Sequence, residues 1–469
     1  MSLIIYIFNL RGDQRTVGEQ SRKEGGKIFG SGSRTPIAIT LLVKDGSDNH
    51  EIFYHDVEDY LSQMNKLEIL KKTESINEIE WKNLQPDSNN DWINQRNEEY
   101  KKYESMDGQI FRTKNVGVST SRDAWTYNFN KDRVIENSNR MIENYNNELE
   151  NFDKDGYAQN SSSSYIKWSS KLRNSFSKSK KINKSEKVFL SSYRPFTKKW
   201  VTSNRDIIER PGRYNYNNFE NVGIIITGKG ASREFSAIVT DNIPNLHYMD
   251  TGQAFFLKET NKEEGFLSNN NIKESFRKKL KINDTWDTFA YIYALLNSKQ
   301  YKKIFATDLT KDAPRIPLVK YSDSYIIIGK KLLDLHLSYE NIDFFPDLII
   351  QKKDNPSYTV QKIKFGKIRN SDGKLENDKS TIIFNSDIII KNIPSVAYEY
   401  IVNGRSAIEW IIDQYQVKID RKSANLDDPN EYSEDPKYVY NLLLSIINLS
   451  IKSVELINSL PPFEIKEND

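Results

Sequence analysis

Apolar stretches along the chain are short and alternate with polar segments, which is typical of a protein built from both strands and helices. Residues 3–10 are continuously apolar, β-branched and aromatic, as in a strand buried on both faces. Two further strands are predicted over 36–43 and 51–57, and the Asp45-Gly46 pair between them predicts a β-hairpin. Because few chains open inside a core strand, we expect the sequence to begin within a domain.

Helical spacing of apolar residues marks several later segments. Residues 131–152 place Val134, Met141, Tyr145 and Leu149 on one face of an amphipathic helix. Other helices are predicted over 58–72, 286–305, 325–337, 406–415 and 435–460, the last opened by Asp435-Pro436. Strands are predicted over 222–227, 235–240, 253–258, 358–365 and 381–390. The predicted fold class is therefore α+β, without an internal repeat or a heptad array.

Composition supports a folded, polar protein. Hydrophobic residues make up 37% of the 469 and charged residues 28%, with a mean hydropathy of -0.69. Aromatic residues reach 12%, a supply that disordered chains lack. At about 150 residues per domain, this length allows roughly three units.

Several classes of site and location are excluded by residue content. The chain has no cysteine, so disulfides and thiolate metal sites are absent. The four histidines form no i, i+3 or i, i+4 pair, and we therefore expect no metal site. The apolar N-terminus has neither a basic region nor a small-residue cleavage site, unlike a signal peptide. No apolar run approaches the length of about 20 residues that a bilayer requires, so we expect a cytoplasmic protein with no membrane partner.

Positive charge is concentrated in one part of the chain. Net charge is only +3, yet residues 161–200 contain eleven lysines and arginines against the single acid Glu186. Such a stretch can neutralise several phosphates of a nucleic acid. It is also rich in serine, as a solvated basic loop would be. Charge alone leaves both interpretations open.

Two short segments match known catalytic motifs only in part. Residues 223–229 match the first seven positions of a phosphate-binding P-loop, but Gly230 stands where Ser or Thr must hold magnesium. A strand that ends in a tight turn fits better, and this turn could present Lys229 and Arg233 to a DNA phosphate. Residues 460–463 resemble an amino-methyltransferase motif, but Leu460 cannot accept a hydrogen bond from a target amine.

The most distinctive stretch lies near the start of the chain, where residues 9–16 read NLRGDQRT and residues 21–39 read SRKEGGKIFGSGSRTPIAI. It resembles the region after the catalytic motif in the adenine-N6 methyltransferase domain of Type ISP restriction-modification enzymes. Later segments are similar to the target-recognition region of that family, and they lie at 117–129, 193–196, 243–247, 314–317 and 397–410. The resemblance touches nearly the whole chain and keeps the order of the family.

Members of that family are single chains with an endonuclease, a helicase-like ATPase, an adenine-specific methyltransferase and a C-terminal target-recognition domain. The resemblance implies that residues 1–60 are the C-terminal remnant of a methyltransferase domain, the terminal strands of a Rossmann-like sheet. Residues 61–469 would then form the DNA target-recognition region, a mixed α/β region with a long C-terminal helix, in one lobe or in two (61–210 and 211–469). The implied function is to position double-stranded DNA for adenine N6-methylation and cleavage by upstream domains of the same polypeptide.

The chain departs from the family in what it lacks. The cofactor-binding glycine motif, the Asn-Pro-Pro-Tyr motif and the helicase motifs are not in this sequence. We therefore expect no complete active site, no catalytic residue and no cofactor of its own. The family's S-adenosylmethionine, ATP and Mg²⁺ would belong to the parent enzyme.

Eight cations are the candidates for DNA contact, because Arg and Lys suit both phosphates and base edges. They are Arg122, Arg194, Lys198, Lys199, Arg205, Lys229, Arg233 and Arg315. The nearby aromatic residues Trp125, Tyr127, Tyr193 and Phe196 are expected in the core instead. Two other functions remain open: a docking scaffold with only non-specific DNA contacts, and an enzyme whose motifs are not recognisable. The missing motifs argue against the enzyme.

Overall fold

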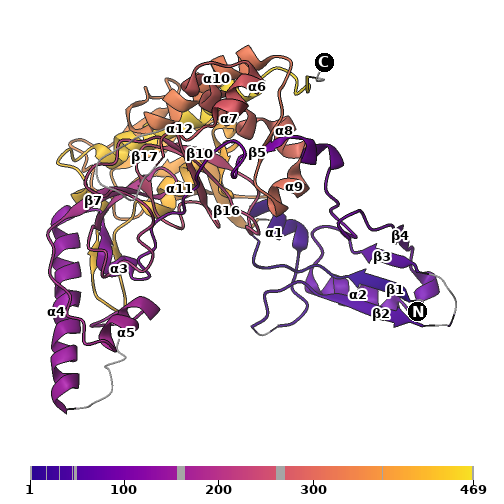
Figure 1. Cartoon of the computed structure of the whole chain (residues 1–469), viewed down its shortest axis with the longest axis horizontal. Helices are drawn as coiled ribbons and strands as arrows, with labels where there is room; N and C mark the ends of the chain where they lie inside the picture. Colours follow the sequence, from indigo (N-terminus) through magenta and orange to yellow (C-terminus); the bar gives the residue numbers. More distant parts are fainter. Residues whose placement is uncertain are drawn as a thin grey trace. The chain divides into compact units, whose positions relative to one another are not determined.

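The chain forms two compact units in a computed structural model that describes residues 3–16, 18–30, 32–44, 46, 50–155, 164–259, 270–371 and 373–466 (Figure 1). The first unit comprises residues 1–103, 229–234 and 305–312, and the second comprises 104–228, 235–304 and 313–469. The second therefore includes most of the chain. The boundary predicted after residue 60 and the two lobes predicted within 61–469 stay predictions.

A four-stranded sheet forms the centre of the first unit. Its strands are β1 (Ile4–Asn9), β2 (Ala38–Val43), β3 (Ile52–Asp56) and β4 (Lys82–Leu84), in the order β2-β1-β3-β4. β1 pairs antiparallel with β2 and parallel with β3. The predicted hairpin between the second and third strands is therefore wrong. β1 is continuously apolar and takes the central position between them, and Asp45 of the expected turn lies outside the described residues.

Helix α2 (Gln63–Lys72) packs under this sheet and begins after Ser62, whose side chain accepts a hydrogen bond from the Asn65 amide at 3.2 Å. The core includes Phe8, Leu10 and Val57. The other helices of the unit are α1 (Gly18–Glu24), η1 (Ile76–Glu78), η2 (Glu98–Lys102) and α9 (Ala306–Lys311).

Lys66 of α2 is fully buried beneath a glycine pair. Its ammonium group donates to the carbonyl oxygens of Glu24 at 2.6 Å and Gly26 at 2.9 Å, and burial lowers its pKa. A side chain at Gly25 would place its Cβ 2.2 Å from the carbonyl oxygen of Leu61. The glycines thus allow the chain to pass close over α2, and Lys66 holds it there.

The second unit contains several small sheets rather than one large sheet. One has the order β11-β7-β8-β6, another β10-β9-β12 and a third β14-β17-β16-β15; the rest are two-stranded. These strands are β5 (Glu104–Ser105), β6 (Tyr127–Asn128), β7 (Val188–Arg194), β8 (Thr197–Thr202), β9 (Gly223–Ile226), β10 (Ala237–Thr240), β11 (Ile243–Pro244), β12 (Gln253–Phe256), β13 (Arg315–Ile316), β14 (Ile349–Lys352), β15 (Lys364–Arg369), β16 (Leu375–Ile383), β17 (Ile388–Lys391), β18 (Ile401–Val402), β19 (Arg405–Ser406), β20 (Lys418–Ile419) and β21 (Leu426–Asp427).

The second unit also contains helices, and the mixed composition confirms the α+β class. They are α3 (Asp123–Thr126), α4 (Lys131–Asp155), α5 (Ser170–Phe176), α6 (Glu274–Leu280), α7 (Thr285–Asn297), α8 (Lys299–Ile304), α10 (Ser322–Leu337), α11 (Ala407–Gln414) and α12 (Tyr438–Asn458), with the short helices η3 (Tyr339–Asn341), η4 (Ser395–Tyr398) and η5 (Pro429–Glu431). The helix predicted over 286–305 is in fact two helices, because Ser298 is extended. The strand predicted over 381–390 is likewise the end of β16, a turn and β17.

Helices α7, α10 and α12 form the centre of the second unit. Gly329 of α10 lets this helix approach α7 closely, since a Cβ there would lie 2.1 Å from the carbonyl oxygen of Ala290. Within the described ranges, α12 is the helix that is long and apolar enough to cross a membrane, which corrects the expectation that no apolar run approaches this length. Most of α12 is buried against its neighbours, as in a core helix.

Candidate nucleic-acid interface

Arg122 lies at the start of α3 and points into the second unit, with only 2% of the residue exposed. Its Nε donates to the carbonyl oxygen of Lys167 at 3.1 Å, and its two terminal nitrogens donate to the carbonyl oxygen of Ile207 and the hydroxyl of Ser169. Burial lowers the pKa of Arg122 to about 10, opposed by the nearby Glu209. The guanidinium is still charged at neutral pH, and it is used inside the unit rather than presented at its surface.

The segments that Arg122 bridges are also bonded to each other. Ser169 donates its hydroxyl to the Glu209 carboxylate, which also accepts from the Lys171 amide at 3.1 Å. The Lys171 ammonium donates to the carbonyl oxygens of Arg205 at 2.5 Å and Ile208 at 2.9 Å. We call this set the Arg122 junction; it consists of Arg122, Lys167, Ser169, Lys171, Ile207 and Glu209. It fixes residues 167–171 against residues 205–209.

Exposed cations lie on the two segments that the Arg122 junction fixes and on the loop that follows. Four of them form no ion pair within the described ranges: Lys167, Arg205, Arg210 and Arg213. Arg205 is held in place, because it donates to the Tyr214 carbonyl at 2.6 Å and stacks 4.5 Å above the Tyr216 ring. An ordered surface with such cations suits the phosphates of a nucleic acid.

The basic stretch over 161–200 is structured where it is described, from residue 164 onward, and forms α5, β7 and β8. Between α5 and β7, residues 177–187 are turn and irregular backbone with exposed lysines, so the interpretation as a solvated basic loop fits that segment. It is wrong for the residues of α5, β7 and β8. At least five of its eleven cations pair with acids of the same unit. The pairs are Lys180–Asp206, Lys181–Glu150, Lys184–Glu143, Lys198–Glu340 and Lys199–Asp427. Much of the positive charge is thus neutralised within the protein.

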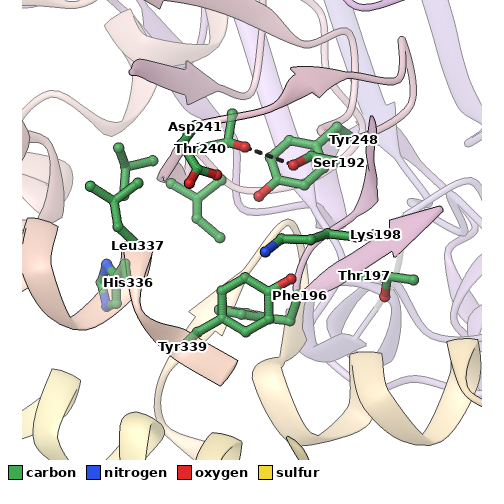
Figure 2. Close-up of a pocket in the computed structure, with 12 residues that line it drawn as sticks. Ser192, Phe196, Thr197, Lys198, Thr240, Asp241, Tyr248, His336, Leu337 and Tyr339 are labelled. Carbon is green, nitrogen blue, oxygen red and sulfur yellow. Dashed lines mark hydrogen bonds between the residues drawn. The ribbon is translucent and has the colours of Figure 1, made fainter. Parts of the chain in front are cut away.

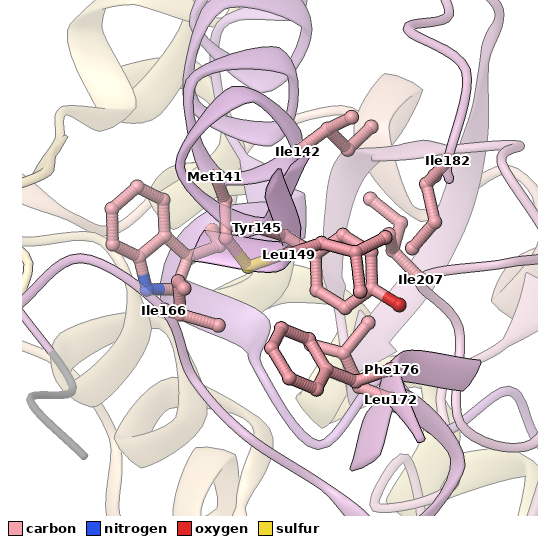
Figure 3. Packing of buried hydrophobic residues seen from close by; sticks show 10 residues of the cluster. Met141, Ile142, Tyr145, Leu149, Ile166, Leu172, Phe176, Ile182 and Ile207 are labelled. Carbon is pink, nitrogen blue, oxygen red and sulfur yellow. The ribbon is translucent and has the colours of Figure 1, made fainter. Parts of the chain in front are cut away.

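A hydrophobic cluster between α4 and α5 gives this region its order. Tyr145 and Leu149 of α4 face Leu172 and Phe176 of α5, and all four are buried (Figure 3). The Tyr145 hydroxyl also donates to the carbonyl of Lys180 at 3.0 Å. The amphipathic helix predicted over 131–152 is confirmed, and its apolar face positions α5 beside the Arg122 junction.

Three predicted contacts lie beside the turn between β7 and β8, with Arg194 at the end of β7 and Lys198 and Lys199 in β8, and they are bonded internally. Arg194 donates to the Tyr193 carbonyl at 2.6 Å and to Asn245 at 3.0 Å, and stacks 4.1 Å above the Tyr193 ring. Lys199 is 5% exposed and forms an ion pair with Asp427. Lys198 pairs with Glu340 at 2.7 Å. The expected core aromatics Trp125, Tyr127 and Phe196 are confirmed as buried, and Tyr193 is half-buried.

A small cavity lies beside this turn (Figure 2). Its interior volume of about 10 Å³ is close to what a single water molecule needs. Lys198 extends between Tyr248 and Tyr339, and the hydroxyls of Ser192 and Thr240 are hydrogen-bonded at 2.6 Å. The cavity is too small for a nucleotide or a cofactor.

His336 lines the same cavity and is fully buried. Ser453 donates its hydroxyl to the Leu449 carbonyl and so accepts from Nε2 of His336, at 2.9 Å. Nδ1 of His336 accepts from the Tyr293 hydroxyl at 2.5 Å. Burial lowers the pKa of His336 to about 3, so the ring is neutral and structural.

The other predicted contacts are spread over both units. Lys229 and Arg233 belong to the first unit, where Lys229 is exposed and Arg233 half-buried. Arg315 is half-buried in β13 of the second unit. Residues 223–226 form β9, the central strand of its sheet, so their backbone amides are used in the sheet and do not form a phosphate loop. Since Arg122 and Lys199 are buried as well, the eight predicted cations do not all face solvent.

Sequence reasoning missed two exposed arginines, Arg210 and Arg213. Their signal was present in residues 205–218, which contain three arginines, three asparagines and two tyrosines. Such a composition is typical of loops that contact nucleic acids. Among the residues that the structure describes, no group of three or more His, Asp or Glu could hold a metal ion.

A mixed α+β unit with ordered, exposed cations has the surface chemistry of a nucleic-acid recognition domain. The family described as Type ISP C-terminal specificity domain matches residues 109–442. The chain belongs to this family.

Solved structures agree with this assignment. One match is a nuclease-deletion mutant of the Type ISP restriction-modification enzyme LlaGI in complex with a DNA substrate mimic. Its sequence is 44% identical to this chain, and the two structures superpose with a TM-score of 0.89. The match covers 99% of this chain and 37% of that one. The ATP-dependent Type ISP enzyme LlaBIII bound to DNA is 36% identical with a TM-score of 0.86, covering 99% and 31%. A DrdV–DNA complex is 23% identical with a TM-score of 0.82, covering 98% and 48%, and supports the fold alone. No curated protein sequence matches this chain.

Proposed function

We propose that this chain recognises the DNA target sequence for a Type ISP restriction-modification enzyme. The observation on which this proposal rests is the 44% identity to LlaGI over 99% of this chain, because that protein is described in complex with a DNA substrate mimic. The chain spans about a third of the length of LlaGI and LlaBIII. Methylation and cleavage are proposed for the remainder of such an enzyme.

In this proposal the second unit holds the duplex by its phosphates at the surface fixed by the Arg122 junction. Lys167, Arg205, Arg210 and Arg213 would donate to phosphate oxygens and set the register of the protein on the DNA. Because the junction fixes the backbone beneath Lys167 and Arg205, these cations need little reordering on binding, which favours affinity. Side chains elsewhere in the unit would then read base edges in the major groove.

The first unit is proposed to be the C-terminal part of an adenine-N6 methyltransferase domain, with β1–β4 as the end of a Rossmann-like sheet. Strand β2 supports this proposal, because it lies at the edge of its sheet with Ile39, Leu41 and Leu42 exposed. S-adenosylmethionine, ATP and Mg²⁺ would act in the remainder of the enzyme. We propose a cytoplasmic location, as for an enzyme that acts on DNA.

The exposed apolar edge of β2 also favours a second function. An unpaired strand of this kind is a template for further pairing. The first unit would then dock the upstream domains of the same polypeptide while the second unit binds DNA. Docking by the first unit is compatible with recognition by the second.

The proposal is tested by measuring the affinity of the purified chain for duplex DNA as a function of salt. The Arg210→Ala/Arg213→Ala double variant should lower the slope of log affinity against log salt by about 2, since each phosphate contact contributes about 0.9. The matched control, Lys181→Ala/Lys184→Ala, removes the same charge from ion-paired positions. Equal changes in both variants, or a wild-type chain that binds no duplex, would contradict the proposal.

A further inference from the structure

Strands β15 and β16 extend beyond their sheet as a two-stranded ribbon. Among the described residues, β16 pairs with β17 only at Ile382 and Ile383, so residues 366–371 and 373–378 have no third strand beside them there. The side chains of Ile368 and Leu375 are exposed to 57% and 62%. A two-stranded hairpin without a core is marginally stable in water, and one that exposes apolar side chains gains from a partner.

The two faces of this ribbon differ in charge. A bulge between Phe365 and Gly366 resets the pairing, after which Lys367 pairs with Asn377 and Arg369 with Leu375. Cross-strand partners share a face, so these four side chains form one face, which we call the cationic face. The opposite face contains Gly366, Ile368, Glu376 and Asp378.

Hydrogen bonds hold the ribbon in shape at both ends. At the base, Asp378 accepts from the Ser380 amide at 2.9 Å and the Ser380 hydroxyl at 2.6 Å. At the outer end, Arg369 donates to the Gly373 carbonyl at 2.8 Å. Lys367 donates to the Asn377 side-chain oxygen at 2.7 Å. Each of these cations keeps further N–H donors, and the amide nitrogen of Asn377 keeps its own.

We propose that this ribbon enters the major groove of the DNA and reads base edges with its cationic face. The major groove admits a two-stranded ribbon, and Arg and Lys pair there with guanine O6 and N7, while Asn pairs with adenine. Leu375 would contact a thymine methyl group. The acidic face would point out of the groove, because phosphates repel Glu376 and Asp378. This inference rests on the proposed function and names the element that performs it.

The inference explains the charge of the ribbon better than protection of an edge strand does. Lysines on an edge strand such as β15 can also prevent pairing with other chains. That role needs no separation of charge between the faces, and it needs neither Asn377 nor an exposed Leu375. Base reading needs all of these on one face.

The test compares the motif selected from a random duplex library by the full 469-residue chain and by two variants of the ribbon. The first variant, Lys367→Ala/Arg369→Ala/Asn377→Ala, removes the cationic face. The matched control, Ile368→Thr/Glu376→Gln, alters the opposite face. We expect the first variant to lose preference at two or three adjacent positions, to bind the wild-type site at least tenfold more weakly, and to keep the remaining positions. The control should select the wild-type motif.

A second measurement distinguishes base reading from a structural effect. Guanines at the lost positions are replaced by 7-deazaguanine, which lacks the N7 acceptor. This replacement should weaken binding by the wild type and not by the cationic-face variant. An unchanged motif in that variant, or a wild type indifferent to 7-deazaguanine there, would overturn the inference while the proposed function stands. A wild type that selects no motif would overturn both.

Discussion

The Arg122 junction and the β15–β16 ribbon place their cations in opposite ways. Arg122 is 2% exposed, and its three donor groups bond to Lys167, Ile207 and Ser169. On the ribbon, Lys367 and Arg369 are exposed and form no ion pair within the described part of the chain. A cation near the proposed DNA-binding surface can therefore either stabilise the fold beneath that surface or remain available to contact DNA, and its burial decides which role it has.

Removing the buried guanidinium of Arg122 should have the largest effect on the free energy of unfolding. Arg122→Ala leaves the carbonyls of Lys167 and Ile207 and the hydroxyl of Ser169 without this donor inside the unit. We expect the free energy of unfolding to fall by about 3–5 kcal/mol, because three buried acceptors lose a charged hydrogen-bond donor. Urea denaturation measures this change. Arg213→Ala is the control, with an expected change within about 0.5 kcal/mol; similar losses in both variants would refute the difference between the two kinds of cation.

The buried ring of His336 should make the stability of the protein depend on pH. Burial lowers the pKa of His336 to about 3 from an ordinary value of 6.5. The unfolded chain therefore binds a proton that the folded chain excludes, and stability falls as pH drops from about 6.5 toward 3. The expected loss from this group is about 2 kcal/mol at pH 5. Urea denaturation at pH 7 and pH 5 should show a smaller loss for His336→Gln than for the wild type, and an equal loss would contradict the role of His336.

The smallest effect is expected on the ribbon. Leu375→Thr replaces an exposed apolar residue by a β-branched polar one that suits a strand. The free energy of unfolding should change by less than about 0.5 kcal/mol, as measured by urea denaturation. A loss above about 2 kcal/mol would mean that Leu375 has a buried contact and that the ribbon is not free.

The local pattern of apolar and polar residues predicted many helices and strands. The prediction failed where strands pair with partners that are distant in the sequence. The long amphipathic helix α4 followed from its apolar spacing, and α12 from its opening proline and apolar faces. The predicted hairpin of the first unit was wrong because β1, distant in sequence, inserted between the two strands. The β15–β16 ribbon was missed, although Asp372-Gly373 between two polar strands is a hairpin signal.

The candidate site was harder to predict, because the partner of a cation need not lie nearby in the sequence. Lys198 pairs with Glu340 and Lys199 with Asp427, each more than a hundred residues away. Nothing local distinguishes these lysines from exposed ones. The density of basic residues therefore selected cations that stabilise the fold, whereas Arg210 and Arg213 occur in a less basic segment.

Because Lys66 is buried, trypsin cleavage after this residue would measure the local opening of the first unit. Trypsin cleaves after lysine only where the chain is accessible, and Lys66 is fully buried while Lys71 and Lys72 on the same helix are exposed. Cleavage after Lys66 thus requires the glycine pair to lift from α2, whereas cleavage near the end of α2 needs only fraying. The ratio of the two products would follow the local opening of this unit in the intact protein, without a label or a substitution.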